Sequence, residues 1–443
     1  MKRALAILIL ILCIGAISSP FINGLLMEKV VKQSLQDLGN IYANSGSDIS
    51  IQVVDYQRGY ATSEIEWKID LGSMKSLYNI DEIVFTDHAR HGLTGIVSQT
   101  SLMKNDWYQN FVNNKLNGTD PLSITTAYRL SGDVSATILL DQISLQEKGQ
   151  TVNVQPAKVV VEGDSGMKNI RIDSDFAGLT VPGKIDLKDL SLTAQLEKIS
   201  IYIWDGDISM QLGSSSAVDK KGSFEVSNML TDYKIAYDKT KKSLNIGIDY
   251  GADKLALGDQ GIGRTQLHFA VNNLDGNGYE EFMKLYSATI NDIVKDLPTL
   301  DEAPEQLQKR IQEKMSGAIF QLMSAYEKLL KQGLELQLTN LQVELPEGKA
   351  MGDFVLTLKK DMTFMQFAPL LQQPQLALTL FDIYTNAVVP KALMGDNTTL
   401  MLPLFPGMQT GLFVEDGENF KHSAESRDGK LFLNDKEVNL SEL

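Results

Sequence analysis

The sequence is poor in the residues that build disulfides and metal sites. Its 443 residues include one cysteine and four histidines, so no intrachain disulfide can form and a metal site has few candidate ligands. No P-loop, G-x-S-x-G elbow, C-x-x-C pair or dinucleotide fingerprint occurs in the chain. The sequence therefore predicts a protein that is not an enzyme and that needs no cofactor.

Positive charge is also scarce. There are 41 Lys and Arg against 56 Asp and Glu, which gives a formal net charge of −15 at pH 7. Nucleic-acid binding depends on clustered basic residues that displace counterions from phosphates, so we predict no nucleic-acid partner. The same charge argues against a body that adheres electrostatically to an anionic membrane. With 43% hydrophobic residues, the composition is that of a folded protein.

One long apolar run lies at the N-terminus. Lys2 and Arg3 precede the apolar residues 4–17; Ser18, Ser19 and Pro20 interrupt the run, and residues 21–27 resume it. About 20 apolar residues span a bilayer, and positive charges before the run favour a cytoplasmic N-terminus. We therefore expect residues 1–27 to be a signal anchor with the body translocated. A cleaved signal peptide is the alternative, because small residues stand where signal peptidase cuts.

From about Ile49 to Asn273, apolar and polar residues alternate. Alternation places the apolar side chains of a strand on one face and is typical of antiparallel strands with one dry side. The predicted strands include 65–71, 122–130, 134–140, 190–196, 199–203, 208–212, 244–250 and 267–271. Turn residues at 131–133, 147–149, 205–207 and 238–241 separate them. The predicted class is α+β, mostly antiparallel β, with a long curved meander sheet and a few amphipathic helices packed on it.

The period changes near Asp275. Apolar residues recur every three to four positions over 282–297 and again over 307–329, behind a predicted N-cap at Asp301. Residues 275–278 offer two oxygen ligands of a calcium loop but have no Glu at the twelfth position, so they favour a turn. The predicted parts are a signal anchor at 1–27, an antiparallel β-rich region at 28–275, an amphipathic helical pair at 276–333, and C-terminal strands and short helices at 334–443 that complete the same body.

One-sided strands need a cover for their apolar face, because each buried Leu or Ile contributes about 1.5–3 kcal/mol. Two closures satisfy this requirement. The sheet can fold onto itself and the helices around a filled core, or it can curl into an apolar groove that binds hydrophobic ligands. The sequence is compatible with both.

One candidate motif is Tyr56-Gln57-Arg58-Gly59-Tyr60, at a strand break. An arginine beside a glycine could clamp an anion. The favoured interpretation is a β-bulge or hairpin, in which Gly59 permits the bend and Arg58 stacks on Tyr56 or Tyr60.

A second candidate motif is His88-Ala89-Arg90-His91-Gly92, with an H-x-x-H spacing. Two histidines could share a metal only if both imidazoles faced one cavity, and strand residues three apart point to opposite faces. We therefore favour a turn whose imidazoles bond to backbone groups.

The chain resembles the YdgA-like family of bacterial envelope proteins, a family of unknown function. The likeness covers essentially the whole length, although Tyr60-Ala61 stand where the family pattern has Trp-Phe, and Leu93 where it has Pro. It implies a Gram-negative bacterium, an inner-membrane anchor with a cytoplasmic N-terminus, and a periplasmic body, and it supplies no catalytic residues. It is carried by the basic-apolar leader, Tyr56-x-Arg58-Gly59-Tyr60 with Ser63, His88, His91-Gly92, the β-rich body, Asp428-Gly429-Lys430-Leu431 and Leu433-Asn434-Asp435-Lys436.

Three functional hypotheses follow from the sequence. The first is a non-enzymatic, anchored periplasmic protein whose sheet groove binds lipid or another hydrophobic ligand. The second is an envelope structural protein with a filled core that binds another envelope protein. The third is a periplasmic hydrolase or metal enzyme that uses His88 and His91.

Overall fold

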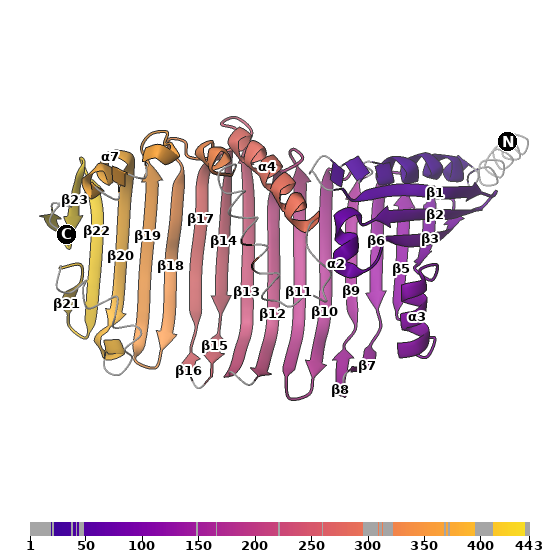
Figure 1. The fold of residues 1–443 in the computed structure, drawn as a ribbon, viewed down its shortest axis with the longest axis horizontal. Helices are drawn as coiled ribbons and strands as arrows, with labels where there is room; N and C mark the ends of the chain where they lie inside the picture. The colour runs from indigo at the N-terminus through magenta and orange to yellow at the C-terminus, as the bar shows by residue number, and fades with distance from the viewer. Residues whose placement is uncertain are drawn as a thin grey trace, which may run out of the picture. The chain divides into compact units, whose positions relative to one another are not determined.

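The computed structural model describes residues 19, 22–36, 39–40, 42–43, 48–147, 149–164, 166–219, 222–258, 260–295, 309, 312, 322–366, 369–370, 373–394 and 411–438. These residues form antiparallel strands with a few helices (Figure 1), which confirms the predicted α+β, mostly antiparallel class. The chain divides into two compact units. Unit 1 comprises residues 1–177, 193–202 and 286–318, and unit 2 comprises residues 178–192, 203–285 and 319–443.

Unit 1 is built on an antiparallel ladder in which strands pair largely in chain order. The ladder runs through β1 (Ser50–Arg58), β2 (Thr62–Asp70), β3 (Glu82–His91), β4 (Gly95–Ser101), β5 (Leu122–Arg129), β6 (Asp133–Leu140) and β9 (Ala157–Asp164). A separate hairpin joins β7 (Ile143–Glu147) to β8 (Gln150–Val154). The strands β10 (Asn169–Val181) and β11 (Ile185–Lys198) contribute residues to both units.

Helices interrupt the region that the sequence predicts as β-rich. Residues 22–36 are helical, and we call them the N-terminal helix. A 3₁₀ turn, η1 (Gly72–Met74), and the short α2 (Lys75–Tyr78) connect β2 to β3. The helix α3 (Asp106–Lys115) buries Tyr108 and Val112, four residues apart on one face. Ten residues with a single short apolar stripe are easily overlooked among alternating strands.

Unit 2 contains the longer ladder. It runs through β12 (Trp204–Asp219), β13 (Gly222–Asp238), β14 (Ser243–Ala252), β17 (Thr265–Asp275), β18 (Glu335–Leu345), β19 (Gly348–Leu358), β20 (Phe381–Pro390) and β22 (Asn419–Arg427). The C-terminal hairpin is β23 (Lys430–Leu433) and β24 (Lys436–Val438). Shorter elements are β15 (Lys254–Leu257), β16 (Gln260–Ile262), β21 (Val414–Asp416), α7 (Ala377–Leu380), η2 (Phe364–Gln366), η3 (Pro374–Leu376) and η4 (Lys391–Met394).

The change of period near Asp275 is the junction between β17 and the helix α4 (Gly276–Lys295). The Asp275 carboxylate accepts a hydrogen bond from the Gly278 backbone N–H at 2.7 Å, so it caps the helix. Residues 275–278 therefore begin a helix, where the sequence favoured a turn. The second predicted helix of the pair, from Asp301, lies mainly outside the described residues, of which 322–327 are helical.

The predicted strand at 199–203 and the predicted turn at 205–207 are wrong. Residues 199–203 are not a strand but connect β11 to β12, and the predicted turn at 205–207 lies inside β12. The Asp205 carboxylate accepts a hydrogen bond from the Tyr237 backbone N–H at 2.7 Å, and Gly206 takes a φ of 142° within the strand. Pairing with β13 thus overrides the local Asp-Gly turn chemistry. The turns at 131–133, 147–149 and 238–241 are confirmed by the strand ends around them.

The predicted signal anchor lies largely outside the described residues, since only residues 19 and 22–27 of that segment are described. Among the described helices, none has both the length and the apolar character needed to cross a bilayer. The anchor therefore stays a prediction.

The described buried apolar residues gather in small clusters. One lies where the N-terminal helix meets β2, β3 and β4, and consists of Met27, Val31, Ile65, Ala89 and Ile96. A second, in unit 2, consists of Leu212, Val226 and Ala252. A third, near the C-terminus, consists of Leu378, Ala424, Leu431 and Leu433. On the central strands of unit 2, Leu244, Ala270, Leu274 and Leu358 are also buried.

Candidate functional site

The central strands of unit 2 align their apolar side chains in two rows across the sheet. The strand register places six apolar residues side by side in the first row: Ile208, Tyr233, Ile248, Phe269, Leu338 and Phe354. The second row, two residues along each strand, consists of Ile235, Ile246, Val271, Leu336, Leu356 and Ile383. Positions two apart on a strand share a face, so both rows belong to one apolar face, which we call the apolar face.

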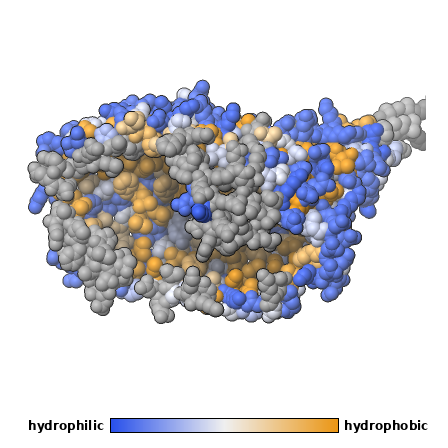
Figure 2. Space-filling model, in the orientation of Figure 1, coloured by the Kyte–Doolittle hydropathy of each residue, from blue (hydrophilic) through white to orange (hydrophobic). Residues whose placement is uncertain are grey.

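Ten of these twelve side chains are half-buried, and Tyr233 and Phe354 are exposed. Tyr233 and Phe354 are 36% and 37% exposed. Figure 2 shows apolar side chains gathered in a recessed part of the visible surface, over the strands between β14 and β19. A filled core would bury side chains at these inward positions, so the structure leaves accessible apolar surface on this face of the sheet.

The opposite face of the same strands is polar. One row there consists of Ser209, Asp232, Asp249, His268 and Thr339. His268 Nδ1 and Asp249 Oδ1 lie 2.7 Å apart and pair on this outward surface. The sheet thus has one face suited to water and one suited to a hydrophobic ligand or cover.

The Tyr56-Gln57-Arg58-Gly59-Tyr60 motif lies at the hairpin between β1 and β2 in unit 1. Gly59 closes the turn, since its N–H donates to the Thr62 carbonyl at 2.8 Å. The anion that Arg58 meets is Glu28 of the N-terminal helix, at 3.5 Å, while Tyr60 is 54% exposed. The motif therefore joins the hairpin to the helix.

Tyr56 lies under the N-terminal helix. The Lys32 ammonium stands over its ring, 5.6 Å from the centroid. Burial raises the pKa of the Tyr56 hydroxyl, and the neighbouring Ser63 hydroxyl partly opposes that rise. A hydrogen bond from Lys32, with the charges of Lys32 and Arg58, lowers the pKa of Glu28. Polar and aromatic groups thus fix the helix on the sheet.

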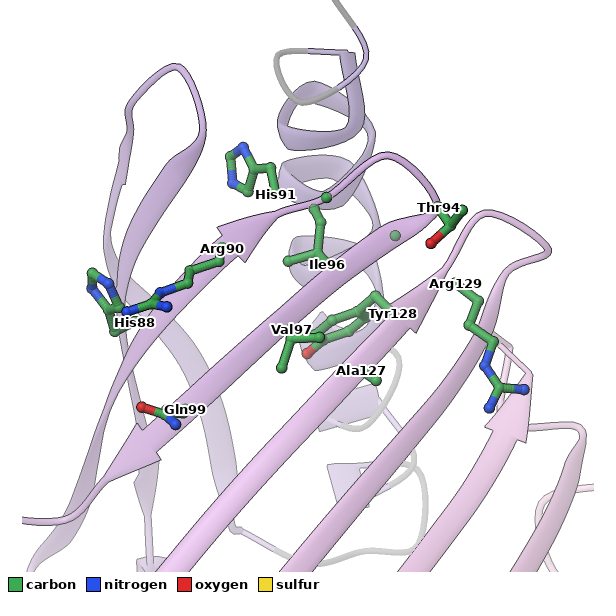
Figure 3. A pocket seen from close by; sticks show the side chains of 12 residues that line it. His88, Arg90, His91, Thr94, Ile96, Val97, Gln99, Ala127, Tyr128 and Arg129 are labelled. Atoms are coloured by element: carbon green, nitrogen blue, oxygen red, sulfur yellow. The ribbon is translucent and has the colours of Figure 1, made fainter. Parts of the chain in front are cut away.

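The two histidines of the second motif do not converge. They lie at the end of β3, so the predicted turn at these positions is wrong. His88 is exposed and pairs with Glu64, whereas His91 is buried and its Nε2 is 2.9 Å from Ser63 Oγ. Figure 3 shows the two rings directed apart. Side chains on opposite faces of a strand point apart, so the two imidazoles are not placed to bind one metal ion together, although both border one pocket.

His91 and Gly92 receive the start of the N-terminal helix. A Cβ added at Gly24 would lie 2.4 Å from His91 Cε1, so only glycine allows this approach. The Asn23 side-chain amide donates to the Gly92 carbonyl at 2.6 Å, and Gly92 N–H donates to the Gly95 carbonyl at 2.7 Å. His91 and Gly92 thus dock the helix on the turn between β3 and β4.

Sequence reasoning missed a buried carboxyl group, Asp87, on the inward face of β3. It accepts a hydrogen bond from Trp67 Nε1 at 2.8 Å and another from the Thr100 hydroxyl. Burial raises the pKa of Asp87, and these two donors partly oppose the rise. Burial and the charge of Asp87 together raise the pKa of Tyr128. The alternation of Phe85, Asp87 and Ala89 could have signalled an inward acid.

A pocket of about 580 Å³ opens on the outward face of β3, β4 and β5. Its lining includes Arg90, Val97 and Arg129, and both His88 and His91 border it. Figure 3 shows the two arginine side chains on either side of Val97. In the described part of the chain, no group of three or more His, Cys, Asp or Glu residues could hold a metal ion.

Comparison with known proteins gives a family without an assigned activity. The family model described as "Bacterial protein of unknown function (DUF945)" matches residues 1–441. The chain is similar to Protein YdgA of Escherichia coli (strain K12), with 22% identity over 327 residues. This match covers 66% of the chain and 62% of that relative, so it spans less than two thirds of the relative's length. No solved structure matches the chain.

Proposed function

The chain belongs to the DUF945 family of bacterial proteins of unknown function, and from that premise we propose that it is an inner-membrane-anchored periplasmic protein that binds lipid or another hydrophobic ligand on the apolar face. The observation that carries the proposal is the alignment of twelve apolar side chains in two rows, none of them fully buried. The anchor itself is argued from the basic-apolar residues 1–27.

A hydrophobic ligand suits this face better than a polar one. The six residues of each row follow one another on adjacent strands, about 4.8 Å apart, so a row of six covers roughly 24 Å. That length is sufficient to lie along an extended acyl chain, since it exceeds the roughly 15 Å of hydrocarbon in one leaflet of a bilayer. The rows offer apolar contact along their whole length, with charged side chains kept to the opposite face.

Photo-crosslinking in cells tests the ligand. Cells are grown on a fatty acid that carries a diazirine, irradiated, and the full-length chain is extracted in detergent for residue-level mass spectrometry. Lipid adducts should fall on Ile248 and Phe269, and not on their outward neighbours Asp249 and His268. Inward-facing and outward-facing residues alternate along each strand and therefore fall in the same peptide. The outward-facing residues thus serve as an internal control for the adducts on the inward-facing ones.

Two results would count against this function. A full-length chain that carries no lipid and no adduct on either row would remove the ligand. Protein–protein crosslinking that traps one specific envelope partner on the apolar face, with no lipid there, would instead support the interaction protein.

The anchor and the location have their own test. A C-terminal alkaline phosphatase fusion should be active, because that enzyme folds only outside the cytoplasm, and the full-length chain should resist alkaline carbonate extraction. The matched fusion carries a C-terminal fluorescent protein that matures only in the cytoplasm. Fluorescence of this fusion, together with an inactive phosphatase fusion, would refute the periplasmic location.

A further inference from the structure

We infer that one edge of unit 1 rests on the surface of an anionic lipid bilayer. Three hairpin turns lie at this edge, since alternate turns of an antiparallel ladder fall on the same side. We call residues 58–62, 90–95 and 129–133 the tip edge. The inference rests on the membrane anchoring in the proposed function, and it does not depend on the ligand of the apolar face.

Each turn of the tip edge presents an arginine followed by an exposed apolar or aromatic residue. The pairs are Arg58 with Tyr60, Arg90 with Leu93, and Arg129 with Leu130. The three large side chains are 54%, 58% and 59% exposed, respectively. Leucines at turn tips gain contacts by entering the boundary between headgroups and acyl chains, and tyrosine favours the same depth.

The N-terminal helix begins at the same edge. The Ser19 hydroxyl donates to the Leu93 carbonyl at 3.2 Å, and the Asn23 side-chain amide donates to the Gly92 carbonyl. In the sequence, the apolar residues 4–17 end two positions before Ser19. Two residues span at most about 7 Å, so a bilayer entered by residues 4–17 lies within reach of Leu93.

The local charge of the tip edge is opposite to that of the whole chain. Its three segments contain three arginines and one carboxylate, Asp133, although the chain carries a net charge of −15. Within the described residues, Arg90 and Arg129 have no ion-pair partner, whereas Arg58 pairs with Glu28. Glu28, Glu64 and Asp164 lie beside these segments, and screening limits the effect of charges farther away to about 8 Å at physiological salt. The attraction for headgroup phosphates therefore rests on Arg90 and Arg129.

The spacing of the two unpaired arginines favours a surface over a single small anion. Arg90 and Arg129 stand on strands separated by β4, on either side of Val97 (Figure 3). Two guanidinium groups held apart in this way can each contact a separate phosphate, with an exposed apolar residue between them. A lipid bilayer supplies phosphates and apolar depth together.

Depth-dependent fluorescence quenching of the full-length chain tests the inference. The chain, with Cys13→Ser, is reconstituted into vesicles of phosphatidylethanolamine and phosphatidylglycerol. Single cysteines at Leu93→Cys and Leu130→Cys carry an environment-sensitive dye, and lipids with headgroup nitroxides act as quenchers. Tyr78→Cys, at the opposite end of the β2–β3 pair, is the control, since Tyr78 is also 54% exposed.

The dyes at residues 93 and 130 should shift to the blue and lose emission to the nitroxides, whereas the dye at residue 78 should do neither. Arg90→Gln with Arg129→Gln should reduce that quenching, whereas Arg171→Gln, exposed and paired with Asp173 in the same unit, should leave it unchanged. Tip dyes quenched no more than the control dye would overturn the inference.

Alkaline carbonate extraction of the same vesicles separates the two proposals. A chain that is retained, with unquenched tip dyes, would overturn the docking and leave the anchor in place. A chain that is washed off, after its tip dyes were quenched in the intact vesicles, would support docking and refute the anchor.

Discussion

Replacing Phe354 with Glu should abolish most of the affinity of the apolar face for a hydrophobic ligand. Phe354 ends the first row and is 37% exposed. An aromatic side chain presents roughly 200 Å², so a ligand on this residue removes about 70 Å² from water, which contributes about 2 kcal/mol or roughly 20-fold in affinity. The carboxylate of Phe354→Glu adds a desolvation cost, so a loss of at least this size is expected.

The matched control is Tyr384→Glu on the neighbouring strand. Tyr384 is 42% exposed and aromatic like Phe354, but it pairs with Val355 and therefore faces the other side of the sheet. Both variants add one negative charge at an exposed aromatic position, so their effects on overall charge and folding should be similar. Only Phe354→Glu should weaken ligand binding.

The assay is titration of the full-length chain with a dansyl-labelled fatty acid at one fixed detergent concentration, with thermal unfolding measured alongside. Equal affinities for Phe354→Glu and the wild type would refute the reasoning. So would equal losses in both variants, since these would show that the sheet face does not decide binding.

Three further predictions concern Gly24 in the N-terminal helix and the buried acid Asp87. Gly24→Ala should destabilise the helix by about 1–3 kcal/mol, because the added methyl group overpacks against His91; helix propensity offsets up to about 1 kcal/mol of this loss. Adding His91→Ala should remove the clash, so the two effects should not add when the stability of the helix is measured by amide hydrogen exchange. Strictly additive effects would contradict the contact. The folded state raises the pKa of Asp87, so the protonated carboxyl stabilises the fold at low pH. This contribution is lost as the pH rises from the ordinary pKa of an aspartate through the raised pKa of Asp87. Asp87→Asn, which cannot ionise, should therefore gain stability over the wild type as the pH rises. A pH-independent difference in melting temperature would show that Asp87 is not desolvated, and Asp87→Ala, which leaves the Trp67 N–H without its acceptor, should cost about 1–3 kcal/mol.

Much of the fold could be predicted because it depends on local patterns. Alternation identified the strands around Trp67, Ile138 and Ile248, and turn residues identified the hairpins at 131–133 and 238–241. The failure at 205–207 has a clear cause: the Asp205 carboxylate and Gly206 favour a turn locally, but pairing with β13 keeps them in a strand. A pattern read along the chain contains no information on such partners.

The candidate sites could be predicted only in part. The motif residues Tyr56, Arg58 and His91 do gather in space, where the structure places them against the N-terminal helix. Asp87 was missed because its burial and hydrogen bonds depend on Trp67 and Thr100, on the neighbouring strands. Both cases depend on contacts between residues far apart in the sequence.

By itself, the sequence determined that this chain forms antiparallel strands with one apolar side, because the side chains of a strand alternate in direction whatever lies beside it. Only the tertiary structure decided that Ile248, Phe269, Leu338 and Phe354 stand in one row and remain accessible. The register of a strand is set by its hydrogen bonds to neighbouring strands, and the exposure of its side chains is set by the residues that pack over them. Both partners lie tens of positions away in the sequence. That is why one alternating pattern is compatible with a filled core and with an open apolar face.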